Sequence, residues 1–315
     1  MLGRSVARRL DQVTPEDLWA PEVRELCHSC DVVLCNLECC ISSRGTPTER
    51  VRGKPFFFRG PPEVVGSLEA IGVGAVGLAN NHALDYETEA LTDTLELLDA
   101  AGIAVAGAGR DLRAAREAAF VEAAGTRVGL VAMTDHPSEF VAGEVEPGVA
   151  HADLGRDLPN WLRAELARAR EECDWLIAFP HWGPNMTTEP ARWQREAAAA
   201  LQGGGADLVA GHSAHVFHGV GWGRGPLIFD LGDALDDYRV DPRLRNDLGV
   251  LAIWRPGDPE AELELVGLEL CFCLTRIAEG TAAEWIASRL ERACGALGTT
   301  VERCAEARFR VVAPG

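Results

Sequence analysis

Short runs of Val, Ile and Leu alternate along this chain with longer stretches whose apolar residues recur at helical spacing. An apolar run of about four to eight residues is typical of a buried strand, and a period of about 3.6 residues is typical of an amphipathic helix. This alternation favours an α/β fold. The predicted strands are Asp31–Cys35, Val73–Leu78, Ile103–Ala106, Arg127–Met133, Trp175–Phe179, Asp207–Ala210 and Leu227–Leu231. The predicted helices between them include Thr88–Ala101, Asn160–Cys173 and Pro190–Gln202.

The pattern changes after Asp247. Residues 249–254 and 262–270 alternate apolar and polar side chains, as antiparallel strands do, residues 281–297 read as a helix, and residues 308–312 as a last strand. A chain of 315 residues is long enough for one or two domains. We predict one main domain over residues 1–255, with residues 256–315 forming a small α/β appendage packed on it.

The charge balance excludes some functions. The chain has 48 Asp plus Glu against 30 Lys plus Arg, and a net charge of −18. Such an excess of carboxylates repels phosphate backbones and anionic lipid, so we expect neither general nucleic-acid binding nor adhesion to a membrane surface. Local basic patches are not excluded by this count.

Cysteine content and the apolar runs bear on the compartment. Ten cysteines among 315 residues are too sparse for a disulfide scaffold, and buried free thiols in a reducing compartment are expected, including the Cys27-x-x-Cys30 pair. No apolar run has the length of a membrane span, and residues 1–19 lack the apolar core of a signal peptide. The sequence as written predicts a soluble, cytoplasmic protein, and leaves open a targeting segment upstream of Met1.

Polar residues follow the predicted strands, one group after another. They are Asn36 and Glu38, then Asn80, Asn81, His82 and Asp85, then Asp135 and His136, then His181, then His212 and His215, and finally Asp233. Because ligands bind at the carboxyl ends of strands in open α/β sheets, we expect these side chains to meet at one edge.

A plainer interpretation exists for some of them. A single Asp after a strand, such as Asp135 or Asp233, is commonly a cap or a turn residue. His28 and His151 read as surface residues, while His136 and His218 are left open. Histidine is a mediocre helix cap, however, so capping does not account for four histidines at strand ends. A functional cluster is the better interpretation.

The chemistry of the cluster indicates metal. Imidazoles combined with amides and a carboxylate, without thiolate, suit Mn, Fe or Zn. Ligands from several strands suggest two divalent ions about 3.5–4 Å apart, which clamp the attacking and leaving oxygens of a phosphate ester. His82 and Asp85 form a separate unit, since a nearby carboxylate orients an imidazole for general acid catalysis. Asp85 also reads as the cap of the helix that starts near Tyr86, and the two roles are compatible.

These residues carry a resemblance to a known family. The segments are NLECCIS (36–42), KPFFFRGPP (54–62), LANNHALDYETEALTDTLELLDAAGIAVAGAG (78–109), HWGPNM (181–186), GADLVAGHSAHVF (205–217) and LGDALDDYRVDPRLRND (231–247). Together they closely resemble the bacterial CapA-type capsule-synthesis family, named for poly-γ-glutamate capsule formation and similar to the calcineurin-like metallophosphoesterases. The resemblance implies a four-layer α/β/β/α sandwich of two mixed sheets, with a dinuclear centre at one edge.

The resemblance also implies individual roles. Asn81 would be a metal ligand, and His82, paired with Asp85, would be the catalytic acid. The imidazoles of His181, His212 and His215 would bind metal, and the Asn36-x-Glu38 segment would supply further ligands, with Glu38 bridging the two ions. The His-x-x-His spacing at 212–215 departs from the usual His-x-His, so the pairing of each imidazole with each ion stays open. Residues expected to support these ligands or to contact substrate are Asn80, Trp182, Asp233 and Arg245, with Tyr238 shaping the pocket and Arg4, Lys54, Arg59 and Arg239 as further candidates for holding an anion.

The beginning of the chain departs from the family pattern. Members open with a strand ending in Gly-Asp, whose Asp is the first metal ligand, followed within two residues by a segment like Met1-Leu2-Gly3-Arg4. That strand and aspartate are not in this sequence. A start assigned too late or a trimmed chain is one explanation, and a natural loss, which would put activity in doubt, is the other.

Three functions are compatible with these residues. The first is a dinuclear metal-dependent hydrolase of phosphoester type, linked to capsule or poly-γ-glutamate biosynthesis. A second is a non-catalytic accessory protein for the synthesis or export of an anionic polymer. The third is a metal-dependent amide hydrolase acting on γ-glutamyl bonds, which the sequence does not separate from the first. All three have an anionic small molecule or polymer as partner.

Overall fold

The computed structural model describes residues 1–258 and 262–314. The helices are α1 (Arg4–Arg9), α2 (Pro21–His28), α3 (Val65–Glu69), α4 (Glu87–Ala100), α5 (Leu112–Arg116), α6 (Asn160–Glu172), α7 (Arg192–Gly203) and α8 (Gly280–Gly295), with 3-10 turns η1 (Pro15–Leu18), η2 (Pro62–Val64) and η3 (Ser138–Phe140). The strands are β1 (Val33–Asn36), β2 (Cys40–Ile41), β3 (Arg59–Gly60), β4 (Val73–Gly77), β5 (Ala104–Ala106), β6 (Ala108–Gly109), β7 (Ala119–Ala123), β8 (Thr126–Thr134), β9 (Gly148–Val149), β10 (Trp175–His181), β11 (Leu208–Ala210), β12 (Val220–Trp222), β13 (Pro226–Ile228), β14 (Leu248–Trp254), β15 (Leu263–Leu270), β16 (Thr275–Ile277), β17 (Thr300–Ala305) and β18 (Arg308–Val312).

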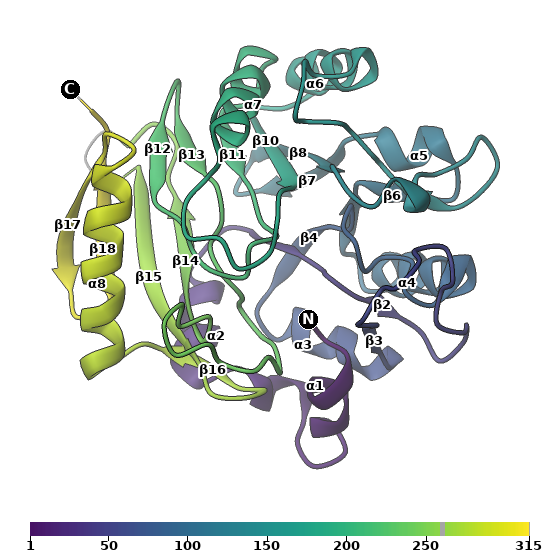
Figure 1. Cartoon of the computed structure of the whole chain (residues 1–315), viewed down its shortest axis with the longest axis horizontal. Coiled ribbons are helices and arrows are strands. Elements are labelled where there is room, and N and C mark those ends of the chain that lie inside the picture. The colour runs from purple at the N-terminus through teal and green to yellow at the C-terminus, as the bar shows by residue number, and fades with distance from the viewer. Residues whose placement is uncertain (259–261, 315) are drawn as a thin grey trace.

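The six-stranded sheet runs in the order β12-β13-β11-β10-β8-β7, with its central strands parallel and its two outer strands antiparallel to their neighbours. Because successive side chains of a strand point to opposite faces, β10 divides its residues between two cores. Leu176 and Ala178 belong to the cluster that packs under α6 and α7, while Ile177 and Phe179 belong to the main core on the other face. Figure 1 shows α6 and α7 on the outer side of this sheet.

The second layer is the parallel sheet β1-β4-β5, which packs against the six-stranded sheet through contacts of β4 and β5 with β7 and β8. Helix α4 contacts β5 on the opposite side. It is followed by Gly102 with φ +71°, the left-handed conformation expected of a glycine just after a helix. The order helix, sheet, sheet, helix confirms the predicted α/β sandwich.

The C-terminal part forms an antiparallel sheet of its own, β14-β15-β18-β17, with β16 added beside β15. Helix α8 packs along this sheet and also contacts β12, at the edge of the six-stranded sheet (Figure 1). The predicted boundary between residues 255 and 256 falls between β14 and β15, which pair along their whole length. The division into domains therefore stays a prediction.

Some elements differ from the sequence-based expectation. The strand predicted over residues 227–231 ends at Ile228, and the buried Asp230 that follows accepts the backbone N–H of Gly232. Strand β17 was not predicted, since an edge strand with mostly exposed side chains lacks an apolar signature. The early helices α1 and α2 were not predicted either. No helix within the described ranges is long and apolar enough to cross a membrane.

Candidate functional site

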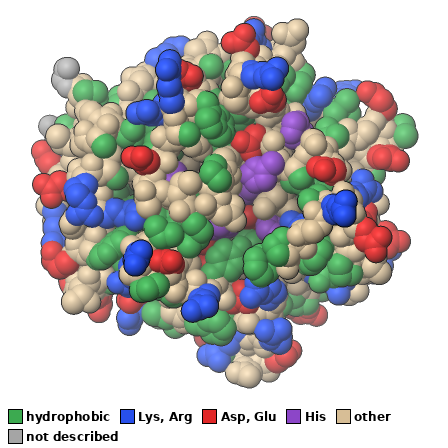
Figure 2. Space-filling view, viewed as in Figure 1, with side chains coloured by type: hydrophobic (Ala, Val, Ile, Leu, Met, Phe, Trp, Pro, Cys, Tyr) green, Lys and Arg blue, Asp and Glu red, His purple; other side chains and the backbone are tan. Residues whose placement is uncertain are grey.

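The carboxyl ends of four parallel strands bring the predicted site residues together. Asn36 ends β1, the segment of Asn80, Asn81 and His82 follows β4, and His181 ends β10. His212 follows β11, and its backbone forms an isolated parallel β-bridge with that of His181. The two imidazole ring centres lie 5.0 Å apart. Histidine side chains gather near the middle of the face shown in Figure 2.

The carboxylate of Glu38 lies at the centre of this cluster. Its Oε1 atom is 4.0 Å from His82 Nε2, 4.0 Å from His181 Nε2 and 3.9 Å from His215 Nε2. These separations are too long for hydrogen bonds. Two ligands each about 2.1 Å from a shared ion stand at most about 4.2 Å apart, so the separations have the scale of ligands around a common ion.

Several buried polar atoms here have no hydrogen-bond partner. They are Glu38 Oε1, Asn81 Oδ1 and both ring nitrogens of His181 and of His212. Leaving a buried polar atom unpaired costs about 1–3 kcal/mol, so a concentration of such atoms needs a compensating ligand. Nitrogen and oxygen donors of this kind fit a divalent ion such as Mn, Fe or Zn. Within the described ranges, no group of three or more His, Cys, Asp or Glu side chains is placed so that it could hold an ion as it stands.

His82 is oriented by a buried carboxylate. Its Nδ1 atom is 2.6 Å from Asp85 Oδ2, which also accepts the backbone N–H of Phe58 at 2.6 Å. The other oxygen, Asp85 Oδ1, is 3.1 Å from Lys54 Nζ, and that ammonium donates to the carbonyl of Asn81 at 2.6 Å. Lys54, predicted as a candidate for holding an anion, is instead the buried ion-pair partner of Asp85.

His215 is oriented in the same manner from the opposite side. Its Nδ1 atom is 2.9 Å from Asp233 Oδ1, and its ring packs edge-on against Tyr238 with the centres 5.0 Å apart. Burial disfavours the charged imidazole, but the carboxylates of Asp233 and Glu38 outweigh burial and raise the pKa of His215 to about 10. The imidazolium in turn outweighs the burial of Asp233 and lowers the pKa of that carboxyl.

The other two histidines are held neutral. Burial, aided by the neighbouring His212 ring, lowers the pKa of His181 well below its usual range. Burial also lowers the pKa of His212 to about 3. A neutral imidazole offers the lone pair that a metal ion requires, so both rings are in the ligating form at neutral pH.

Two asparagines support Glu38 and the His82 loop. Asn36 Nδ2 donates to Glu38 Oε2 at 3.3 Å, and Asn36 Oδ1 accepts from Asn80 Nδ2 at 3.1 Å. The Asn80 amide also donates to the carbonyl of Leu37 at 2.8 Å and accepts the backbone N–H of His82 at 3.0 Å. The side chain of Asn80 thus connects the segment after β4 to the end of β1, which is a supporting role. Asn36 also acts here through hydrogen bonds to neighbouring side chains.

Two predicted contacts lie elsewhere. Trp182 is buried in the core under α7, where it stacks on Phe229, meets Trp193 edge-on and donates to the Phe229 carbonyl at 3.1 Å. Arg245 makes a bidentate ion pair with Asp247, with its Nη2 2.8 Å from Asp247 Oδ2. The structure therefore uses Trp182 for packing and Arg245 in a local ion pair.

Other residues of the site were not assigned from sequence. His136, left open there, has its ring centre 5.2 Å from that of His181 and pairs with Asp135. Asp230 is buried and accepts the backbone N–H groups of Ala214 and Gly232, and burial raises the pKa of its carboxyl to about 7. Burial and the charge of Asp233 raise the pKa of Asp236 to about 8. A lone Asp in a turn gives no sequence signal that separates these roles from capping.

The fold and the cluster define a class: an α/β sandwich with histidines, a carboxylate and amides at the strand ends. Residues 1–238 match the family described as "Bacterial capsule synthesis protein PGA_cap", and the chain belongs to this family. The CapA-type resemblance is thereby confirmed.

Individual relatives support the same assignment. A Mycobacterium tuberculosis (strain ATCC 25618 / H37Rv) protein described as a probable polyglutamine synthesis accessory protein is 32% identical over 286 residues, which cover 86% of this chain and 74% of that protein. The PGA biosynthesis protein CapA of Bacillus subtilis (strain 168) is 26% identical over 240 residues, which cover 75% and 61%. Among solved structures, a hypothetical protein from Thermus thermophilus aligns with 81% of this chain and 88% of that chain, at a TM-score of 0.40 and 14% identity.

Proposed function

We propose that this protein is a metal-dependent hydrolase of an anionic ester, of phosphoester type. The observation that carries the proposal is the position of Glu38 Oε1, 3.9–4.0 Å from the Nε2 atoms of His82, His181 and His215. A buried carboxylate surrounded by imidazoles from separate strands, with partnerless nitrogens on His181 and His212, is costly for stability alone. A metal ion bound among these atoms would give them partners and so offset that cost.

The residues around Glu38 would supply the ligands of the metal ions. The neutral imidazoles of His181 and His212 would hold two divalent ions together with Glu38 and the amide oxygen of Asn81, and His215 would join them once it gives up its proton. When bound, such ions polarise a phosphoryl oxygen and lower the pKa of a coordinated water. Asn36 and Asn80 fix the carboxylate and the loop through their hydrogen bonds, so the ligand atoms are held in place before substrate arrives.

His82 would protonate the leaving group. Its Nδ1 is bound to Asp85, and its Nε2 faces the cluster, 4.0 Å from Glu38 Oε1. Asp85 stabilises the charged imidazolium, and it is itself held by Lys54 and the Phe58 N–H. After the proton leaves Nε2 for the ester oxygen, the neutral ring keeps its orientation because Nδ1–H still donates to Asp85.

The test combines metal analysis with turnover. We expect purified protein to contain Mn, Fe or Zn by plasma mass spectrometry and to hydrolyse p-nitrophenyl phosphate or its diester. His82→Ala should lower turnover at least about 100-fold and keep the metal, because general acid catalysis contributes about 10²–10⁴-fold. His181→Ala should lose metal and turnover together. His28→Ala, at an exposed histidine of α2, is the matched control and should change neither. Absence of bound metal together with turnover indifferent to His82→Ala would sink the proposal.

The names of the relatives favour a second candidate. One is called a polyglutamine synthesis accessory protein and another a PGA biosynthesis protein. This chain would then act on γ-glutamyl amide bonds with the same site, or bind an anionic polymer without catalysis. Hydrolysis of γ-glutamyl-p-nitroanilide that depends on His82 would select the amide substrate. Polymer binding equal in wild type and His82→Ala, with no turnover of any substrate, would select the accessory role.

A further inference from the structure

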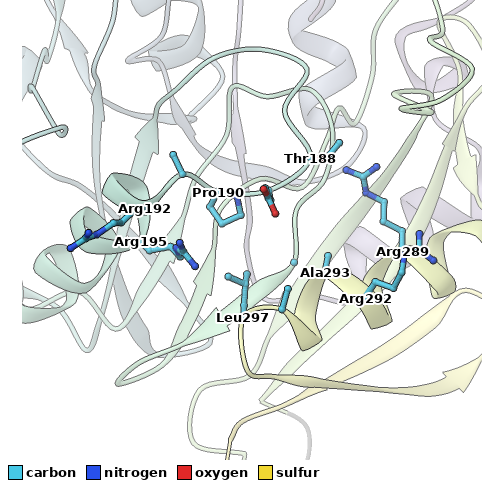
Figure 3. A pocket seen from close by; sticks show the side chains of 12 residues that line it. Thr188, Pro190, Arg192, Arg195, Arg289, Arg292, Ala293 and Leu297 are labelled. Carbon is cyan, nitrogen blue, oxygen red and sulfur yellow. The ribbon is translucent and has the colours of Figure 1, made fainter.

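A cavity lined by several arginines lies beside α7 and α8. It has a volume of about 580 Å³ and is lined by the approach to α7, the first turn of that helix and the C-terminal half of α8. Figure 3 shows Arg195 on one side of the cavity and Arg289 and Arg292 on the other, while the side chain of Arg192 points away from it. Glu189 is the acidic residue among the lining residues. Of these four arginines only Arg192 is ion-paired in the part of the chain that the structure describes, with Glu196, so the other three against Glu189 make a local positive site in a chain of net charge −18.

The arginines are incompletely paired. The side chain of Arg195 makes no hydrogen bond or ion pair within the described ranges, and the side chain of Arg292 donates only to the hydroxyl of Ser288. Arg192 is 2.7 Å from Glu196 on the exposed side of α7. Surface arginines of this protein are commonly paired with a carboxylate, as Arg110 and Arg276 are. Paired cations need no ligand, whereas Arg195 and Arg292 retain free donors at the cavity.

Arg289 adds a buried charge. It is 8% exposed, and its Nε and Nη2 atoms donate to the carbonyl of Phe217 at 3.1 and 3.0 Å. The rings of Phe217 and Trp285 pack against the guanidinium, but no carboxylate of the described residues forms an ion pair with it. Burial, together with the charge of Arg292, lowers the pKa of Arg289 to about 10, so it remains charged at neutral pH. A buried cation without an anion is costly.

The backbone of α7 adds to the positive charge at the cavity. Helix α7 begins at Arg192 and runs for 12 residues, and Ala191 and Arg192 at its N-terminus line the cavity. Helix N-termini carry a partial positive charge and stabilise anions. A volume of about 580 Å³ exceeds what one carboxylate or phosphate fills and is within the range of about 300–1,000 Å³ for small-molecule sites.

We propose that this cavity binds an anion carrying two or more carboxylate or phosphate groups, held by Arg195 and Arg292 over the buried Arg289. The residues that line it are separate from the histidine cluster, so the site depends neither on bound metal nor on the proposed hydrolysis. Arg289 is the fixed part of the site, since its carbonyl and ring contacts hold it in place. Arg195 and Arg292 are exposed and close over the ligand, because each has donors free for a bidentate contact.

The test is calorimetric titration at low ionic strength, with pyrophosphate and γ-linked triglutamate as probes and acetate as the single-charge control. We expect wild type to bind at least one probe and acetate far more weakly. The double variant Arg195→Gln/Arg292→Gln should weaken binding at least about tenfold, because it removes two cations that make charge-assisted hydrogen bonds to the anion. Arg163→Gln, at an exposed arginine of α6, is the matched control and should bind as wild type does.

Each result decides the proposal. Binding of pyrophosphate alone or of triglutamate alone identifies phosphate or carboxylate as the ligand group, and both outcomes support it. No heat with either probe, or equal affinity in wild type and the double variant, overturns it. His181→Ala should retain binding, and loss there with retention in the arginine variant would place the anion at the histidines instead. Circular dichroism checks that the variants are folded, which is expected since both arginines are exposed.

Discussion

At the residue scale, Asp85 connects the catalytic candidate to the rest of the protein. Its two oxygens face three donors: the His82 ring, the Phe58 N–H and the Lys54 ammonium. Neither Asp85 nor Lys54 is open to solvent, with side-chain exposures of 0% and 7%. The single lysine of the chain is therefore part of the support of His82. A surface ion pair would contribute little to stability, but a buried one that loses a partner costs several kcal/mol.

We predict that Asp85→Asn lowers the free energy of unfolding by about 3–5 kcal/mol. The amide has one oxygen and one NH₂ group where the carboxylate has two oxygens. In either orientation the NH₂ group faces a donor, and Lys54 loses its counter-charge. Urea unfolding of the two proteins at neutral pH measures the difference.

Asp93→Asn is the matched control, since Asp93 pairs with Arg44 at the surface, where the arginine side chain is 59% exposed. It should lower stability by less than about 1 kcal/mol. Equal losses for the two variants would contradict a structural role specific to the buried Asp85 pair.

At the element scale, the predicted site residues were found because they follow the carboxyl ends of predicted strands. His181 and His212 were predicted because each follows an apolar run, and parallel strands bring such positions to one edge. The side-chain partners were not predictable in the same way. Asp230 and Asp236 look like ordinary turn residues in sequence, whereas their burial depends on parts of the chain distant in sequence, such as Ala214, whose N–H donates to Asp230. Trp182 was misplaced because the residue next to His181 points to the opposite face of the sheet, here into the core under α7.

The packing of the two sheets yields a prediction at this scale. Gly77 ends β4 where the three-stranded sheet meets the six-stranded one, and a Cβ atom there would come within 2.8 Å of Phe179 Cε1. We predict that Gly77→Ala destabilises the protein by about 1–3 kcal/mol, because overpacking at a close contact forces strain. Gly203→Ala, at the end of α7 with no atom within 4 Å of the added Cβ, should be neutral or slightly stabilising. Thermal unfolding of both variants measures this, and a neutral Gly77→Ala would contradict tight sheet-to-sheet packing at this point.

At the scale of the whole molecule, the net charge of the chain and the charge of one cavity have opposite signs. A net charge of −18 describes the average surface, yet four arginines of α7 and α8 line one cavity. These helices are far apart in the sequence, and they meet because α8 packs between the C-terminal sheet and β12. No local pattern in the sequence predicts that these two helices line one cavity. The α/β class was predictable from periodicity, whereas the cavity depends on how the C-terminal sheet docks.

The histidine cluster gives the last prediction, a global one. A ligand that binds only the folded protein stabilises it, by about 2.7 kcal/mol at 100 times its Kd. For a chain of 315 residues, with an unfolding entropy of about 2.1 cal/mol/K per residue, that gain raises Tm by roughly 4 °C. We expect Mn²⁺ or Zn²⁺ added to chelator-treated protein to produce such a rise, since the partnerless nitrogens of His181 and His212 gain a partner only in the folded state. His181→Ala should abolish most of the rise, and His28→Ala should retain it. A rise of equal size in all three proteins would mean that the ions bind elsewhere, and no rise in wild type would mean that the cluster binds neither ion, which would leave the unpaired nitrogens as an uncompensated cost of the fold.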